Sequence, residues 1–187
     1  MKRPFPQIDV DYISGVMSLR RPQKTSLKRL ADILEEVPLS KDMPLDSALE
    51  TVNNLFPTCK DFERNFMSLT FALATGVGKT RLMGAFIAYL HKVHHIKNFM
   101  IIAPNITIYN KLIDDFSEGS PKYVFKGMGL TQPAIIKDES DYKTRKWDIS
   151  NALWETAVIN IFNIQKLTSD EKNEIRKSNG CCKQLLC

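Results

Sequence analysis

The residues whose types and spacing could do chemistry lie in one short stretch, ATGVGKT, at positions 74–80. Gly76 and Gly78 allow backbone angles with positive φ and let the main chain approach a phosphate closely, where a Cβ atom would intrude. The Lys79 ammonium can reach the β- and γ-phosphates of a nucleotide, and the Thr80 hydroxyl can bind a magnesium ion. The expected chemistry is therefore the binding of a nucleotide polyphosphate together with magnesium.

The elements that must position this loop are a strand before it and a helix after it. An apolar, β-forming run at 69–74 predicts the strand, and a helical pattern over 80–93 predicts the helix. This order brings a helix N-terminus and several backbone N–H groups against a phosphate chain. The alternative is a chance glycine-rich turn on the surface, and the predicted elements on both sides favour the nucleotide site instead.

Two more strands are predicted after the loop and its helix. Residues 99–103 form a short apolar run that Pro104 ends, and residues 157–164 form a second run. Such runs are typical of strands in a parallel sheet, and a helical pattern over 105–116 lies between them. The alternation of strands and helices predicts an α/β fold, with a parallel sheet covered by helices on both faces.

The region before the loop is predicted to be a helical lead-in, residues 1–66, followed by a P-loop domain at 67–187. Its prolines favour extended chain over 1–24. One helix is predicted to begin near Thr25, and a looser helical pattern covers 45–56.

The amino-acid composition limits the kinds of binding partner and of cellular setting that are expected for this chain. The 26 Lys and Arg residues outnumber the 21 Asp and Glu residues, for a net charge of +5, which suits a polyanionic partner. The longest apolar stretch, 82–90, is far shorter than the roughly 20 residues of a membrane-spanning helix, so no membrane partner is expected. The four cysteines show no C-x-x-C spacing, so we expect no zinc site, no disulfide framework and a reducing, cytoplasmic setting.

Three stretches in a fixed order carry a resemblance to a known family: ALATGVGKTRLM, then MIIAPNITIYNKLIDDF, then VINIFNIQKL. Together they resemble the first, RecA-like motor domain of superfamily two helicases. The likeness is closest to the translocating subunit of type III restriction enzymes and related DEAD/DEAH-like ATPases. Leu73 stands where the general phosphate-loop pattern has its first glycine, and the helicase variant of the loop is met in full.

The resemblance implies roles for individual residues. It implies an ATP and magnesium site that comprises Thr75, Gly76, Val77, Gly78, Lys79 and Thr80, with Lys79 acting in catalysis and Thr80 on the magnesium. It also implies a nucleic-acid track that comprises Pro104, Asn105, Thr107, Asn163 and Gln165. Double-stranded DNA is the implied partner, and a modification (methyltransferase) subunit is implied for the full-length family.

A third implied site is an upstream element that reads adenine. Leu19-Arg20-Arg21-Pro22-Gln23 resembles the family's Leu-Arg-Pro-x-Gln element, whose glutamine binds the adenine edge. An amide suits this role because it can both donate to and accept from adenine. The alternative is a glutamine at an ordinary helix start.

The chain departs from the family pattern in its acidic motif. ATP hydrolysis needs one carboxylate that binds the magnesium ion and a second acidic group that orients the attacking water. A D-E-x-x sequence at the end of an apolar strand supplies both. Asp138-Glu139-Ser140-Asp141 matches this motif, but the apolar run before it, 134–136, is short. The motif also precedes the Asn163–Gln165 segment, whereas the family order places it after that segment. We predict a surface charge cluster there.

We therefore expect a three-layer P-loop domain that is incomplete at its C-terminus, without the acidic strand or the second motor domain. The favoured function is the N-terminal part of an ATP-dependent DNA translocase. The alternatives are a remnant that binds ATP or DNA without turnover, and a P-loop small-molecule kinase. The kinase alternative gives no role to the strand-end segments Pro104-Asn105 and Asn163–Gln165. Weak ATP binding and little or no hydrolysis are expected.

Overall fold

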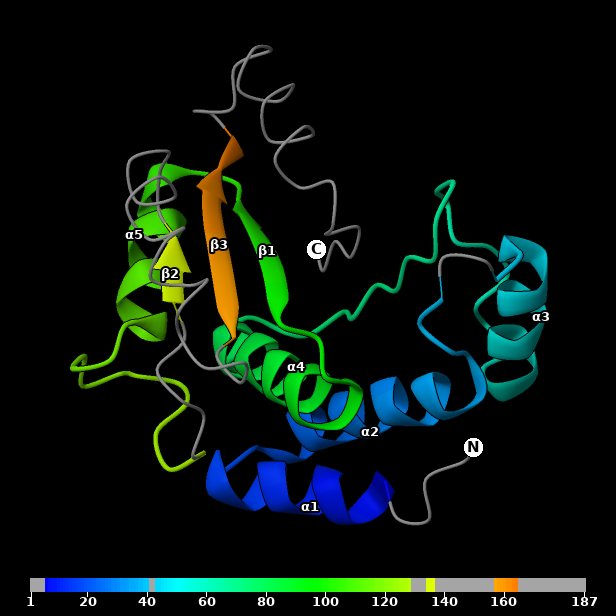
Figure 1. The fold of residues 1–187 in the computed structure, drawn as a ribbon, viewed down its shortest axis with the longest axis horizontal. Helices are drawn as coiled ribbons and strands as arrows, with labels where there is room; N and C mark the ends of the chain where they lie inside the picture. Colours follow the sequence, from blue (N-terminus) through cyan, green and yellow to red (C-terminus); the bar gives the residue numbers. More distant parts are fainter. Residues whose placement is uncertain (1–5, 41–42, 129–133, 137–156, 165–187) are drawn as a thin grey trace. The chain divides into compact units, whose positions relative to one another are not determined.

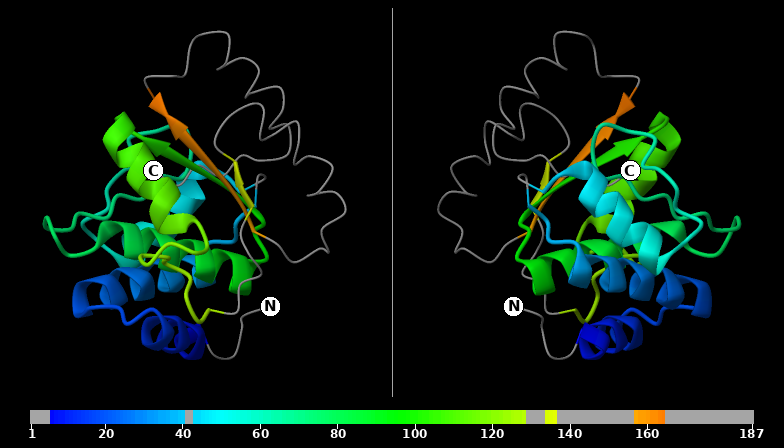
Figure 2. Two further views of the ribbon diagram at one scale, coloured as in Figure 1. Left: turned by 90° about the vertical axis from the view of Figure 1, so that its left-hand side faces the viewer. Right: turned by 90° about the vertical axis from the view of Figure 1, so that its right-hand side faces the viewer.

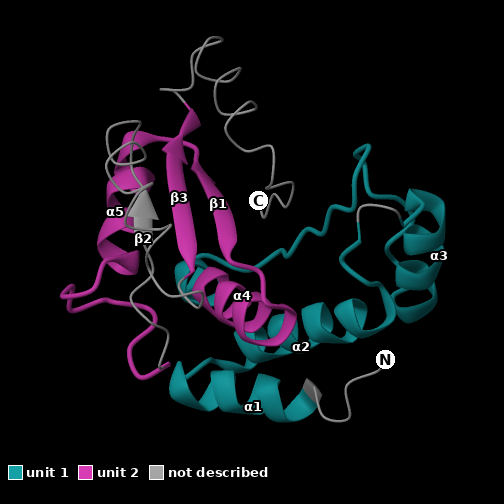
Figure 3. Cartoon of the chain, viewed as in Figure 1, with its two compact units in different colours: residues 1–82 teal, residues 83–187 magenta. Residues whose placement is uncertain are grey.

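The computed structural model describes residues 6–40, 43–128, 134–136 and 157–164 (Figure 1). The elements in order are α1 (Pro6–Val16), α2 (Arg21–Glu36), α3 (Leu45–Leu55), α4 (Lys79–His94), β1 (Asn98–Ala103), α5 (Ile106–Phe116), β2 (Ala134–Ile136) and β3 (Val158–Asn163). The chain divides into two compact units, residues 1–82 and 83–187 (Figure 3). The phosphate loop therefore belongs to the same unit as α1, α2 and α3.

The first unit begins with two helices where extended chain was expected. The prediction of extended structure over 1–24 is wrong for α1, because Pro6 is the first residue of the helix, where no backbone N–H is needed. α2 begins at Arg21, four residues before the predicted start, and Pro22 again lies in the first turn. Val10 and Ile13 are the buried apolar residues of α1, and α2 packs beside α1.

A small apolar cluster joins α2 to α3 and to the chain that follows α3. Its buried members are Ile33, Val37, Ala48, Val52 and Phe62. Met67 and Leu69, which precede the phosphate loop, are half-buried against the same cluster. On the α1 side of α2, Lys24 Nζ lies 2.7 Å from Asp11 Oδ1, and this hydrogen bond lowers the pKa of the Asp11 carboxyl.

Residues 69–74 form irregular chain, so the predicted strand before the loop is wrong. A strand must exchange backbone hydrogen bonds with a neighbour. In the described part of the chain the sheet has three strands in the order β1-β3-β2, and 69–74 is not among them. The physical reason lies in Leu69, whose apolar side chain packs against the helical cluster instead of a sheet.

The second unit contains the parallel sheet. β3 lies between β1 and β2 and is parallel to both, with Phe99 opposite Ile159 and Ile135 also opposite Ile159. β1 and β3 run side by side in each view of the fold (Figure 2). These two strands confirm the predictions at 99–103 and 157–164, and α5, which packs on both of them, confirms the helix predicted between them.

The sheet has one well-buried face in the described residues. Burial alternates along β3, where Ile159 and Ile161 are fully buried while Asn160 and Phe162 are half-buried. Asn160 Nδ2 also donates to the Phe99 carbonyl of β1 at 3.0 Å. The prediction that both faces are fully buried therefore holds for only one face of the described strand. Among the described helices, none is both long and apolar enough to cross a membrane.

Candidate functional site

The phosphate loop has the backbone conformation that its glycines predict. Gly76 has φ 80° and Gly78 has φ 96°, a region that residues with a Cβ rarely adopt. A Cβ built on Gly76 would meet no atom within 4 Å, so the chain leaves open space beside this residue. The loop thus offers both the curvature and the room that a phosphate chain needs.

The helix after the loop begins where the motif requires it. α4 starts at Lys79, one residue before the predicted 80–93 helix, and Leu82 N donates to Gly78 O at 3.1 Å in its first turn. The N–H groups of a helix's first turn have no acceptors within the helix and carry a partial positive charge. The end of the loop therefore presents backbone donors of the kind that bind anions.

Lys79 reaches back over the loop. Its Nζ donates to the Ala74 carbonyl at 3.4 Å, and its side chain is exposed. A phosphate oxygen is a stronger partner for an ammonium group than a neutral carbonyl is, because both members of that pair are charged. Thr80, the predicted magnesium ligand, follows directly and is half-buried. Thr75 is exposed and Val77 is half-buried in the same loop.

Gln23 is brought to the loop from 55 residues away in the sequence. Its Nε2 donates to Gly78 O at 2.8 Å, and its Oε1 accepts from Arg20 N at 2.7 Å, which caps the start of α2. Only 1% of Gln23 is exposed. The structure therefore places this predicted adenine reader against the phosphate loop, and its amide is also engaged at the helix start.

Arg20 also contacts the phosphate loop, and the sequence did not predict this contact. It occupies the N-cap of α2, and its guanidinium Nη1 donates to the Gly76 carbonyl at 3.3 Å. The only sequence signal was its place in the Leu19–Gln23 element. Together Arg20 and Gln23 hold the carbonyls of both loop glycines.

The strand-end residues of the second unit also come together. Ala103, the last residue of β1, lies opposite Asn163, the last residue of β3, so Pro104 and Asn163 are at the same carboxyl edge of the sheet. The first described residues of the two predicted track segments therefore lie at the same end of neighbouring strands. Pro104, Asn105 and Thr107 are exposed, whereas only 3% of Asn163 is exposed. Gln165 lies outside the described residues.

The Asn105 side chain caps the start of a helix. Its Oδ1 accepts from Ile108 N at 2.9 Å and caps α5. We predict that Asn105→Ala lowers the free energy of unfolding by about 0.5–2 kcal/mol, and that Asn105→Ser, which keeps a capping oxygen, restores most of it. Urea unfolding of the three proteins measures this. Equal stability of the alanine variant and the unchanged protein would contradict the capping role.

The acidic stretch near 138 follows a strand of this sheet in the sequence. The short run 134–136 before it is strand β2, with Ile136 opposite Asn160 of β3. Asp138 and Glu139 lie outside the described residues, so the predicted surface charge cluster stays a prediction. Within the described residues, no group of three or more His, Cys, Asp or Glu side chains is arranged to hold a metal ion.

A comparison with family models decides which family these features belong to. The model described as type III restriction enzyme, res subunit, matches residues 16–185. The chain belongs to this family. Neither a curated protein nor a solved structure matches it. The family match confirms the resemblance, and its range includes both the phosphate loop of this res-subunit chain and the strand-end segments.

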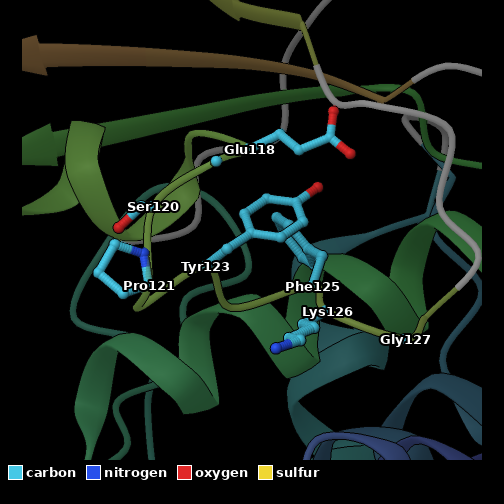
Figure 4. Close-up of a pocket in the computed structure, with 8 residues that line it drawn as sticks. Glu118, Ser120, Pro121, Tyr123, Phe125, Lys126 and Gly127 are labelled. Carbon is cyan, nitrogen blue, oxygen red and sulfur yellow. The ribbon is translucent and has the colours of Figure 1, made fainter.

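A hollow elsewhere on the res-subunit chain contains none of the predicted site residues. It has a volume of about 500 Å³ and lies in the loop after α5, lined by Glu118, Gly119, Ser120, Pro121, Tyr123, Phe125, Lys126 and Gly127. Figure 4 shows the Tyr123 hydroxyl on the side of the Glu118 carboxylate. Burial raises the pKa of Tyr123, and the nearby charge of Glu118 raises it further. The hollow is open, and no cationic or metal-binding cluster marks it as a second nucleotide site among the described residues.

Proposed function

We propose that this chain is the ATP-binding, N-terminal part of a DNA translocase of a restriction system. The observation that carries the proposal is the loop at 74–80, with both glycines at positive φ and α4 beginning at Lys79. Backbone N–H groups of the loop and of the first turn of α4 bind the phosphates, and Lys79 adds a positive charge. The Thr80 hydroxyl would be the protein's ligand for the accompanying magnesium ion, which would neutralise charge on the phosphates.

DNA is proposed to bind at the carboxyl edge of the sheet. Ligands of open α/β sheets bind outside the carboxyl ends of the strands, and the Pro104 and Asn163 segments meet at that edge. Exposed Pro104, Asn105 and Thr107 form the accessible part of this track, while Asn163 supports it from a buried position. Gln165 is proposed to continue the track.

Turnover is proposed to be low in this chain. ATP hydrolysis needs a carboxylate at the magnesium ion, and the sequence contains no strong candidate in the order that the family implies. Asp138 and Glu139 are the residues to test, because they follow β2 in the chain. A modification subunit as partner and a cytoplasmic setting complete the proposal for the intact system.

The ATP site is tested by titrating the chain with a fluorescent ATP analogue in the presence of magnesium, followed by competition with unlabelled ATP. We expect saturable binding with one site per chain that ATP reverses. Removal of magnesium with a chelator should weaken it. An absence of binding at millimolar nucleotide would contradict the proposed function.

DNA binding is predicted to be independent of sequence and to fall steeply with salt, because the contacts go mainly to phosphates. The logarithm of the affinity should decrease with the logarithm of salt concentration by about 0.9 for each phosphate neutralised. Thr107→Glu, which adds a negative charge on the track, should weaken binding. Asn54→Glu makes the same charge change at an exposed position of α3 and should not. Equal effects of the two variants would argue against the track.

A further inference from the structure

We propose that the hollow after α5 is a docking site for an arginine side chain of a partner protein. The hollow has a volume of about 500 Å³ and is open to solvent. That size lies within the range of about 300–1,000 Å³ that is usual for ligand sites. All of its lining comes from residues 118–127, which belong to the second unit, so the proposal does not depend on the nucleotide site at 74–80.

The carboxyl end of α5 leaves negative charge beside the hollow. Glu118 lies two residues after the helix, and in the described part of the chain no hydrogen bond or ion pair engages its carboxylate. Asp114 is exposed in the last turn, which has no basic residue, whereas Asp115 is paired with Lys111 at 2.5 Å. The end of a helix also carries a partial negative charge, which a cation offsets. A positively charged ligand therefore complements this end of the hollow.

Tyr123 forms an aromatic wall beside this carboxylate, and buried rings hold it in place. Its side chain is half-buried, and Figure 4 shows its hydroxyl on the side of the Glu118 carboxylate. Its ring meets that of Phe125 edge-on, with centroids 5.9 Å apart, and Phe125 packs against fully buried Phe116 of α5 at 5.4 Å. Val124 N also donates to a carbonyl in the last turn of α5 at 2.9 Å, which fastens the loop to the helix. The ring and the carboxylate are therefore positioned before a ligand binds.

A guanidinium group fits both features together. It is planar, so it can stack on an aromatic face, and its N–H groups match the two oxygens of a carboxylate. A lysine ammonium offers the charge without the plane, and a neutral side chain offers no charge. Lys126 also lines the hollow, and Figure 4 shows its ammonium at the opposite end of the lining from the Glu118 carboxylate. Lys126 therefore does not neutralise the anionic end.

The occupant belongs to a protein rather than to DNA or to a pool of free small cations. The site is open and presents one carboxylate, and exposed ion pairs contribute little by themselves. Arginine and tyrosine contacts become strong where surrounding contacts exclude water, as they do in protein–protein interfaces. DNA presents phosphates, which the Glu118 carboxylate repels. A basic segment of a partner protein therefore fits the hollow best.

The test titrates the isotope-labelled full chain with a short capped peptide and follows the backbone resonances by NMR. The peptide has one arginine between glycines, and matched peptides carry lysine or citrulline, which is neutral and has nearly the shape of arginine. We expect saturable shifts at 118–127 with the arginine peptide, binding weaker by about threefold to tenfold with lysine, and no shifts with citrulline. Added salt should weaken the arginine peptide, because it screens exposed charges.

Variants assign the binding to the two proposed groups. Glu118→Gln should weaken the arginine peptide by about threefold to tenfold, and Glu50→Gln, which removes the same charge from an exposed position of α3, should not. Tyr123→Phe keeps the ring and should bind within about twofold of the unchanged protein, whereas Tyr123→Leu should lose affinity. Unchanged resonances outside the hollow show that each variant is folded. Titration with Mg·ATP should be the same in Glu118→Gln as in the unchanged protein, which separates this site from the nucleotide site.

Lys126→Gln distinguishes a cationic from an anionic occupant, because it removes a positive charge from the lining. The arginine peptide should bind to this variant as tightly as before or more tightly. A short DNA duplex that shifts 118–127, and does so more weakly in Lys126→Gln, would overturn the proposal in favour of DNA. The absence of shifts at 118–127 with tens of millimolar arginine peptide would also overturn it. So would equal binding of the arginine and citrulline peptides, or of the arginine peptide to Glu118→Gln and the unchanged protein.

Discussion

Lys79→Ala is expected to weaken the binding of Mg·ATP by about 10- to 100-fold. A hydrogen bond between charged partners contributes about 1.5–3 kcal/mol, and Lys79 is the cation that follows the glycine turn. In the structure its Nζ lies 3.4 Å from Ala74 O, so the side chain already spans the loop. Any ATP hydrolysis by the chain, measured as phosphate release, should also be lower in this variant.

The matched control for this prediction is Lys60→Ala, which removes the same charge from an exposed position of the same unit. Lys60→Ala should bind Mg·ATP like the unchanged protein. Titration with a fluorescent ATP analogue measures all three proteins. An Lys79→Ala variant that binds as tightly as Lys60→Ala would contradict the role of the loop. DNA-stimulated turnover that disappears in Lys79→Ala would refute the expectation of low hydrolysis and assign Asp138 and Glu139 to the metal.

Ile161→Ala is expected to lower the free energy of unfolding by about 2–5 kcal/mol. Ile161 is fully buried in β3, the strand between β1 and β2, and removing its side chain leaves a cavity that the neighbours fill only in part. Urea unfolding followed by circular dichroism measures the effect. Because Asn163 follows two residues later, the same change should also weaken DNA binding at the proposed track.

Ile164→Ala is the control, since it removes the same atoms from a side chain that is 53% exposed just after β3. Its effect should stay within about 0.5 kcal/mol, as for most surface substitutions. Equal destabilisation by the two variants would show that β3 does not lie at the centre of the folded core.

The parts of the fold that sequence predicted are those with a strong local pattern. The amphipathic pattern of α5, the apolar runs of β1 and β3, and the loop at 74–80 each specify their own structure. The strand expected at 69–74 failed because an apolar run does not say which partner it packs against, and Leu69 packs against helices. α1 was missed because prolines were taken to favour extended chain, although Pro6 begins the helix.

The contacts that the structure gives to the predicted site residues could not be predicted from the sequence. Gln23 and Gly78 are 55 positions apart, and no periodicity or local motif can show that a glutamine amide meets a glycine carbonyl over that separation. Asn105 carried a readable signal, because asparagine before a helical pattern is a common N-cap. The burial of Asn163 could not be read from sequence, since it depends on the pairing of β3 with β1.

The central claim is that nucleotide binds at the loop and the start of α4. Hydrogen exchange followed by mass spectrometry, with and without saturating Mg·ATP, tests it directly, because it locates the residues whose backbone N–H groups become protected. We predict slower exchange in peptides that cover 74–82, with a smaller effect at 20–27, where Arg20 and Gln23 contact the loop. Saturation with ATP that leaves exchange at 74–82 unchanged, and slows it only elsewhere, would contradict the account.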